Sequence, residues 1–199
     1  LTLETGQFPL SSHAIADKAG VPRENFKIHF VNLKDLQRAA WQAYFYTTIN
    51  TIEDSSQYGE YSVREKLLAF YFTFMEVIGA EAEFARKFQP QMGIWIYNPS
   101  CLDTLKPVFL VYLTELVEEG KATGEVADRM LIQADFAEWH WPQFMYIMNF
   151  WMKDKSESAQ RTDQAIEKSV NLGFDIMGPN VLDSVLDFGK FAFQSLGGK

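Results

Sequence analysis

The sequence is short of cysteine and has no long apolar run. Cys101 is its one cysteine, so no disulfide can form within the chain and no cluster of cysteines can hold zinc. The apolar runs are interrupted by charged or polar residues well before the roughly 18 positions of a membrane span, and the first residues lack a basic segment followed by an apolar one. We therefore expect a soluble, cytoplasmic protein with no membrane contact.

Glycine and proline are also sparse. The 12 glycines and 7 prolines of the 199 residues lie mostly at wide intervals. Between them, apolar residues recur every three or four positions, which is the period of an amphipathic helix, and no stretch alternates as a strand does. Hydrophobic residues make up 47% of the chain, enough for a large core. The pattern predicts an all-α protein.

A strong positive charge is missing as well. The formal net charge is −8, but it is unevenly distributed, because residues 1–50 carry five basic and four acidic side chains. That segment has a net charge of +1, which leaves −9 on the remainder. Any nucleic acid would have to bind the N-terminal quarter, since the rest repels phosphate. A solvated surface of uneven charge explains the same numbers, so charge alone assigns no function.

Capping residues and turn glycines mark the expected helix ends. Asn32 with Asp35, and Ser62 with Glu65, have the spacing of capping boxes, in which two side chains satisfy the first free N–H groups of a helix. We expect eight helices, at about residues 11–19, 22–30, 33–52, 62–88, 99–119, 125–151, 158–177 and 180–196, the fifth bent at Pro107 and the sixth at Pro142.

The segment AIADKAGVPRENFKIHF has the pattern of a helix-turn-helix motif. Ala16 is a small residue where two helices would cross, Gly20 stands in a sharp turn, and Val21 and Phe26 supply apolar contacts. The outer residues of the second helix could then enter the major groove of DNA. A plain αα-hairpin has the same spacing, so the pattern by itself leaves both alternatives open.

This segment resembles the N-terminal domain of TetR-family transcriptional regulators, whose pattern is roughly I-A-x-x-A-G-V-S-x-x-x-L-Y-x-H-F-x-S-K-x-x-L. The matching positions are Ile15, Ala16, Ala19, Gly20, Val21, Phe26 in place of the leucine, His29, Phe30 and Leu36. The stretches REKLLAFYFTFMEVI and NFWMKDKSESAQRTDQAIEKSVNLGFDIM are similar to the larger domain of one branch of that family. The resemblance implies a helix-turn-helix DNA-binding domain over residues 1–53, its first helix truncated or missing, and a helical ligand-binding and dimerisation domain over residues 54–199.

The resemblance also implies that double-stranded operator DNA is a partner. The candidate DNA-binding residues are Arg23, Asn25, Lys27, His29 and Lys34. The chain departs from the family pattern at Lys27, where an aromatic residue is usual, and at Leu33, where lysine is usual. Glu24 also places a carboxylate on the helix that would face phosphates.

Aromatic residues form a second concentration, at 15% of the chain. In the family, the helices that carry them enclose a cavity for an inducer, which implies a small apolar or aromatic ligand here. The candidate ligand-binding residues are Phe74, Met75, Trp95, Tyr97, Phe109, Tyr112, Trp139 and Tyr146. Ordinary helix packing explains many of these rings equally well.

The last expected helix, VLDSVLDFGKFAFQSL, carries two apolar stripes. A surface helix needs one such stripe to face its own core, so the second predicts a partner, and two helices from each of two subunits would form a four-helix bundle. The candidate residues of a homodimer interface are Ile166, Val170, Phe174, Val181, Val185 and Phe188. The alternative is that both stripes are buried within one subunit.

No pattern typical of an enzyme occurs in the sequence. The three histidines are scattered, and no nucleophile elbow, phosphate loop or dinucleotide motif is present, so we expect no catalytic residue, metal or cofactor. The leading hypothesis is a ligand-responsive repressor that binds operator DNA as a homodimer and is released by a small apolar ligand. The alternative is a TetR-like fold that binds a lipid or another apolar molecule without binding DNA.

Overall fold

The computed structural model describes residues 1–6, 9, 11–88, 99–126 and 133–177, with the backbone alone for residues 87–88, 133–139 and 176–177. Every regular element in these ranges is a helix. The α-helices are α1 (Thr2–Thr5), α2 (Ser12–Ala19), α3 (Arg23–His29), α4 (Leu33–Glu53), α5 (Val63–Gly79), α6 (Ala82–Phe88), α7 (Leu105–Thr123), α8 (Gln133–Lys153) and α9 (Gln160–Met177), and the 3-10 turns η1 (Tyr58–Glu60) and η2 (Glu157–Ala159) precede α5 and α9. The predicted all-α fold is confirmed.

The helix starts at α4 and α5 follow the capping residues. The Asn32 side chain accepts a hydrogen bond from the Asp35 N–H at 3.1 Å, and the Asp35 carboxylate accepts one from the Asn32 N–H at 3.2 Å. Ser62 and Glu65 form the same reciprocal box at the start of α5. These two predictions, which depend on neighbouring residues alone, are confirmed.

The helix expected over residues 62–88 is interrupted. The helix α5 ends at Gly79, and α6 begins three residues later at Ala82. Glycine has a low helix propensity, and the chain turns here while the Tyr44 hydroxyl of α4 donates to the Glu81 carboxylate at 2.8 Å. The expectation of one continuous helix was therefore wrong.

Two later helices also have bounds that differ from the prediction. The helix α7 begins at Leu105, not near residue 99, so Pro107 stands in its first turn, where the backbone N–H groups have no acceptor within the helix. Pro107 therefore lies at the start of α7 and, contrary to our expectation, does not bend a longer helix. The helix α7 also extends past Glu119 to Thr123, and α8 begins at Gln133 and continues through Pro142.

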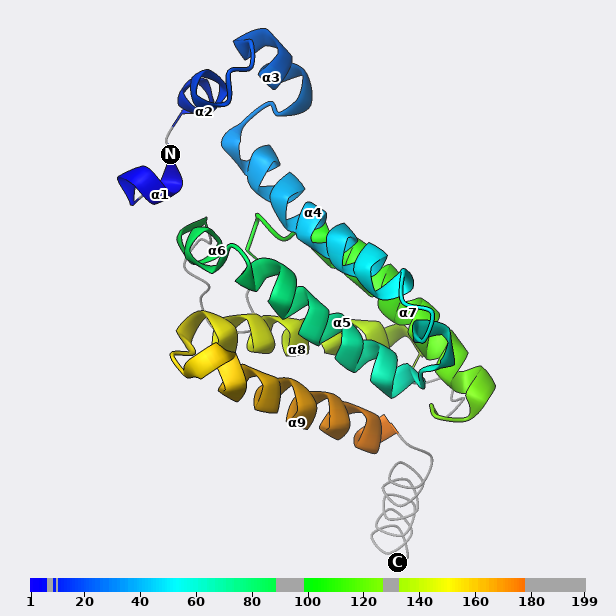
Figure 1. Ribbon diagram of the computed structural model, residues 1–199. Helices are drawn as coiled ribbons and strands as arrows, with labels where there is room; N and C mark the ends of the chain where they lie inside the picture. Colours follow the sequence, from blue (N-terminus) through cyan, green and yellow to red (C-terminus); the bar gives the residue numbers. More distant parts are fainter. Residues whose placement is uncertain (7–8, 10, 89–98, 127–132, 178–199) are drawn as a thin grey trace, which may run out of the picture.

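The main hydrophobic core surrounds α5, which packs against α4, α7 and α9 (Figure 1). Phe70, Tyr71 and Phe74 of α5 are completely buried. They meet Phe45 from α4 and Phe109 from α7 in one continuous cluster. None of the helices in the described part of the chain is both long and apolar enough to cross a membrane.

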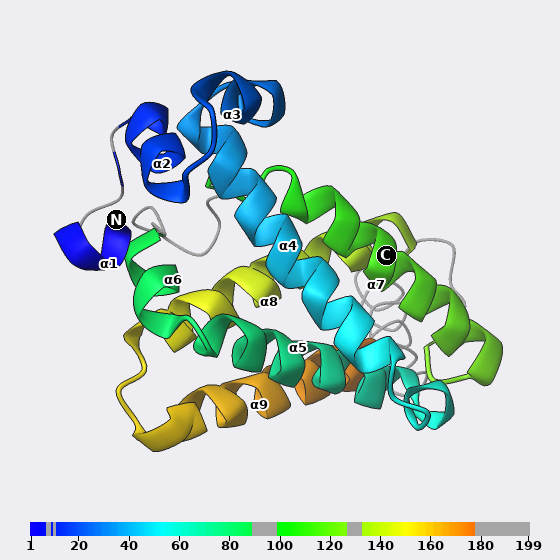
Figure 2. The ribbon, with the colours of Figure 1, turned by 45° about the horizontal axis from the view of Figure 1, so that its top comes forward.

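The helices α2 and α3 lie apart from this core. They contact each other and sit beyond the N-terminal end of α4, at the opposite side of the molecule from α9 (Figures 1 and 2). The short helix α1 packs against α6. The long helix α4 thus joins the N-terminal helix pair, which we define as residues 12–29, to the core.

Candidate functional site

The N-terminal helix pair has the geometry that the sequence predicts. Ala16 is 1% exposed, and the Val21 N–H donates to its carbonyl oxygen at 3.0 Å. Gly20 has a φ of 66°, a left-handed conformation that a side chain would strain. Phe26 is 8% exposed, and its ring centre lies 5.3 Å from that of Phe30. Two helices joined by a three-residue turn are therefore present.

The side chains expected to face DNA lie on the surface. Asn25, Lys27 and His29 are exposed on α3, and Lys34 is exposed at the start of α4. Val21 differs from its expected role in packing, because it is 40% exposed. The part of the four polar residues in DNA binding stays a prediction.

Arg23 is exposed too, but it already has a partner. Its Nε and Nη2 atoms donate to the two carboxylate oxygens of Asp17 at 3.0 and 2.6 Å. These bonds lower the pKa of Asp17 and raise that of Arg23. The positive charge of Arg23 is therefore largely neutralised within the helix pair, which the sequence did not indicate.

Two exposed apolar side chains accompany the polar ones. Ile28 on α3 is 76% exposed and Val31, just after it, is 83% exposed. Beside Val31, a hollow of about 530 Å³ separates the start of α2 from the start of α4. It is lined by Ser11, Ser12, His13, Val31, Asn32, Leu33 and Lys34. The sequence could have identified Ile28 and Val31, because both are apolar residues at outward positions, the first on α3 and the second in the turn after it.

Hydrogen bonds from Arg38 and Gln42, which we call the Arg38 clasp, attach the N-terminal part of α4 to the segment before α7. The Arg38 guanidinium donates to both carboxylate oxygens of Asp103, from Nε at 2.7 Å and from Nη2 at 2.6 Å. It also donates to the Ser100 carbonyl at 3.2 Å and to the Asp35 carboxylate at 3.1 Å. The Gln42 amide adds a bond to the Thr104 carbonyl at 3.1 Å. The helix that carries the N-terminal pair is thereby attached to the larger part of the molecule.

Several of the expected ligand-binding residues meet in an aromatic cluster between α5, α7 and α8. Phe74 and Phe109 are fully buried, and both contact Phe144, with ring centres 5.4 and 4.9 Å away. Tyr112 lies 5.1 Å from the ring of Phe70, and Met75 is 7% exposed. The structure brings these predicted residues together in one core.

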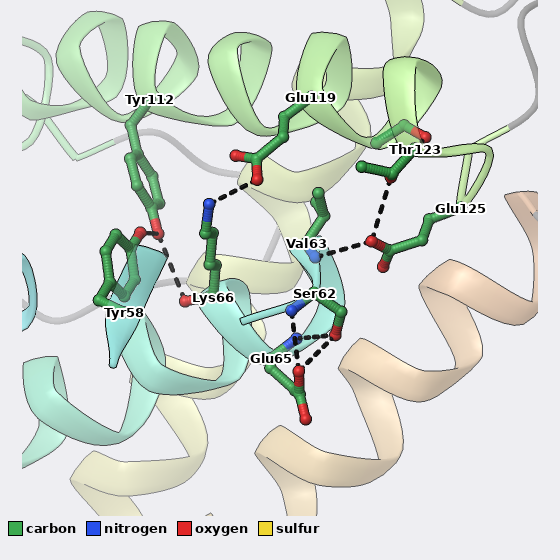
Figure 3. A network of polar contacts seen from close by, with 10 residues as sticks. Tyr58, Ser62, Val63, Glu65, Lys66, Tyr112, Glu119, Thr123 and Glu125 are labelled. Atoms are coloured by element: carbon green, nitrogen blue, oxygen red, sulfur yellow. Dashed lines mark hydrogen bonds and ion pairs between the residues drawn. The ribbon is translucent and has the colours of Figure 1, made fainter. Parts of the chain in front are cut away.

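Tyr112 also belongs to a polar network at the edge of this cluster (Figure 3). Its hydroxyl lies 3.1 Å from that of Tyr58 and donates to the Lys66 carbonyl at 3.4 Å. Burial raises the pKa of Tyr112, so its hydroxyl stays protonated. The Lys66 ammonium in turn pairs with Glu119 of α7. This network joins η1, α5 and α7 at the edge of the core.

Tyr146, another candidate, lies at the surface. Tyr146 is 42% exposed and lies beside Phe150, with ring centres 6.1 Å apart. Trp95 and Tyr97, and the side chain of Trp139, lie outside the described residues. The role of all eight candidates in ligand binding stays a prediction.

The candidate interface residues on α9 face their own subunit. Ile166, Val170 and Phe174 are between 0 and 3% exposed and belong to the main core, where α9 packs on α5 and α8. The Arg64 guanidinium of α5 covers the Phe174 ring at 5.4 Å. We expected these three residues to contact a partner subunit, but they contact their own chain. A single apolar stripe cannot face its own core and a partner at the same time. Val181, Val185 and Phe188 lie outside the described residues.

Comparison with known families decides which class of protein has this core. Residues 66–192 match the family model described as the tetracycline repressor-like C-terminal domain. The match covers more than half of the chain. The chain belongs to the TetR family. No curated protein and no solved structure matches it.

The TetR match covers the part of the chain that forms the aromatic cluster. It begins in the first turn of α5 and extends beyond α9, so it includes the rings of Phe74, Phe109 and Phe144. The resemblance noted from the sequence is confirmed, and the chain is a TetR-family regulator. The helix pair α2 and α3 lies before the matched range.

TetR-family proteins are regulators rather than enzymes. Cys101 is buried, and burial raises its pKa to about 11, so its thiol is a poor nucleophile. Within the described ranges, no three histidine, cysteine, aspartate or glutamate side chains are grouped to hold a metal ion.

Proposed function

We propose that this TetR-family regulator is a repressor that binds operator DNA as a homodimer and releases it when a small apolar ligand enters the aromatic cluster. One observation carries the proposal: an exposed helix bearing Asn25, Lys27 and His29 is attached, through α4, to the family-matched core. Polar and basic side chains on such a helix suit contacts to base edges and phosphates. Residues 1–53 form the DNA-binding domain in this proposal, and residues 54–199 bind ligand and partner.

The proposed dimer uses the outer face of α9. Leu172 on that face is 60% exposed, whereas Ile166, Val170 and Phe174 on the opposite face of α9 are buried. Val181, Val185 and Phe188 are the candidates that the sequence adds to this interface. A two-fold dimer would present two copies of α3 to successive major grooves, about 34 to 36 Å apart.

Selection of binding sites from genomic or random DNA with the full chain tests the proposal. We expect an enriched palindromic sequence, bound with an affinity that falls steeply as salt rises. Lys27→Ala and Lys34→Ala should each weaken binding and reduce the salt slope by about one unit. Lys155→Ala, an exposed lysine between α8 and α9, is the matched control and should change neither.

A second function is favoured by a specific observation at the N-terminal helix pair. Arg23 is paired with Asp17 and Lys18 with Glu4, while Ile28 and Val31 are exposed. These features lower the positive charge available for phosphate. They favour a TetR-like protein that binds a lipid or another apolar molecule without DNA. A selection that enriches no sequence, combined with an apolar molecule retained after mild purification, would establish this alternative.

A further inference from the structure

Two polar atoms in the aromatic cluster have no hydrogen-bond partner among the described residues. They are the hydroxyl oxygen of Tyr71 on α5 and the indole nitrogen of Trp141 on α8. Tyr71 is completely buried and Trp141 is 5% exposed, so water does not reach either group freely. A buried donor without an acceptor destabilises a folded protein, because it has lost its hydrogen bonds to water. Such groups call for an explanation.

The rings that carry the two donors border the same pair of phenylalanine rings. The Tyr71 ring centre lies 6.4 Å from those of Phe109 and Phe144. The Trp141 ring centre lies 6.1 Å from Phe109 and 5.2 Å from Phe144, on which it stacks. Helices α5 and α8 therefore each place one donor-bearing side chain against Phe109 and Phe144.

Other polar side chains near these rings differ from these two. Tyr112 in the same cluster has its hydroxyl paired with Tyr58 and the Lys66 carbonyl. Thr104 and Gln143 also have an unpaired polar atom, but their side chains are partly exposed. Tyr71 and Trp141 are thus the pair that points to a missing acceptor in the interior.

The chemistry of the two groups restricts what could satisfy them. An indole N–H is a donor only, and burial raises the pKa of Tyr71 well above its ordinary value, so its hydroxyl keeps its proton. The rings around them in the core cluster are those of phenylalanine, tyrosine and tryptophan. A charged ligand would lose much of its hydration among these rings.

We propose that the ligand of this core is a neutral, flat aromatic molecule with a hydrogen-bond acceptor, such as a carbonyl oxygen or a pyridine-type nitrogen, which Tyr71 and Trp141 bind. This inference rests on the proposed function, in which a small apolar ligand enters the cluster. Phe109 and Phe144 are in contact in the present structure, with ring centres 4.9 Å apart. The ligand therefore displaces these rings as it enters, which links its binding to a change in the helices that carry them.

A pair of probes that differ only in the acceptor tests the inference. The probes are 9-fluorenone, a flat aromatic ketone, and fluorene, which has a methylene group in place of the carbonyl. Equilibrium dialysis against the full chain measures both affinities. We expect fluorenone to bind about tenfold more tightly than fluorene, because only the ketone satisfies the two donors.

Variants assign that preference to the two residues. Tyr71→Phe and Trp141→Phe should each reduce the affinity for fluorenone by about threefold to tenfold and leave that for fluorene unchanged. Tyr58→Phe is the matched control, since it removes a hydroxyl that already has a partner, and it should keep the preference. Without ligand, Tyr71→Phe should keep or raise the melting temperature, whereas Tyr58→Phe should lower it.

Each outcome separates the inference from the proposed function. Equal affinity for the two probes overturns the acceptor and leaves an apolar ligand in place. A preference for fluorenone that persists in both Tyr71→Phe and Trp141→Phe also overturns it, as does a lowered melting temperature for Tyr71→Phe. If neither probe binds, the result overturns both the apolar ligand of the proposed function and the acceptor inferred here.

Discussion

The N-terminal helix pair and the aromatic cluster of this chain are built on opposite principles. In α2 and α3, Ala16 and Phe26 are the buried side chains. Exposed ion pairs, such as that of Arg23 with Asp17, join the two helices at the surface. In the cluster, rings such as Phe70 and Phe109 are fully buried and contact one another. Substitutions of surface residues in the N-terminal helix pair should therefore change the free energy of unfolding little, whereas almost any substitution in the aromatic cluster should lower it.

The largest expected effect breaks the cluster. Phe109→Ala should lower the free energy of unfolding by about 3 to 5 kcal/mol, because it removes a buried ring and leaves a cavity. Urea unfolding followed by circular dichroism, at one protein concentration, measures this. Ile28→Ala, which shortens an exposed side chain of α3, is the control and should change stability by less than about 0.5 kcal/mol. Similar losses for the two variants would contradict the contrast between the regions.

The next effect concerns the clasp that connects the two regions. Arg38→Ala and Asp103→Ala should each lower the free energy of unfolding by less than Phe109→Ala does, because both remove a bidentate pair that solvent partly screens. The double variant should cost less than the sum, which a double-mutant cycle detects. Arg38→Lys keeps the charge without the planar fork and should restore only part of the loss. Strict additivity would show that the pair contributes nothing.

A smaller effect sharpens the contrast on the DNA side. Asp17→Asn releases Arg23 from its partner and removes one negative charge, so it should tighten binding to the selected operator by about threefold to tenfold at low salt. Fluorescence anisotropy at two salt concentrations measures the affinity and the salt slope. Glu24→Gln removes the same charge without releasing an arginine and should give a smaller gain. Equal gains from both would mean that Arg23 makes no contact with DNA.

The smallest effect is a dependence on pH within the helix pair. Hydrogen bonds and charge from Arg23 lower the pKa of Asp17 below its ordinary value of 3.8. The stabilisation from this pair is therefore fully present above that value and is lost as the pH falls through the lowered pKa. A carbon-13 NMR titration of the Asp17 carboxyl measures the shift, and Arg23→Ala should return the pKa toward 3.8. An unchanged titration in that variant would show that Arg23 is not the cause.

The sequence predicted those parts of the fold that depend on neighbouring residues. The boxes of Asn32 with Asp35 and of Ser62 with Glu65 lie three residues apart, and so local chemistry determined where α4 and α5 begin. The break after Gly79 and the late start of α7 coincide with contacts such as Tyr44 with Glu81 and Arg38 with Asp103. These join residues far apart in the chain, which helical periodicity does not reveal.

The same distinction applies to the candidate sites. The helical period correctly placed Asn25, Lys27 and His29 on the outside of α3. It also identified the apolar stripe of α9, with Val170 at its centre, but a stripe does not specify which surface covers it. The pairing of Arg23 and the unpaired donors in the core depend on side-chain positions, which no pattern in a single sequence contains.

Arg38 lies near the start of α4, far along the helix from its C-terminal end. From Ile52, buried near the end of α4, to Arg38 the helix rises about 21 Å. A hydrogen bond tolerates a change in length of about 0.5 Å, and over that lever arm the tolerance corresponds to a rotation of about 1 to 2 degrees. The same bond placed near Ile52 would allow a much larger swing. Because Arg38 holds α4 close to the N-terminal helix pair, its hydrogen bonds help to set the angle at which α2 and α3 are presented.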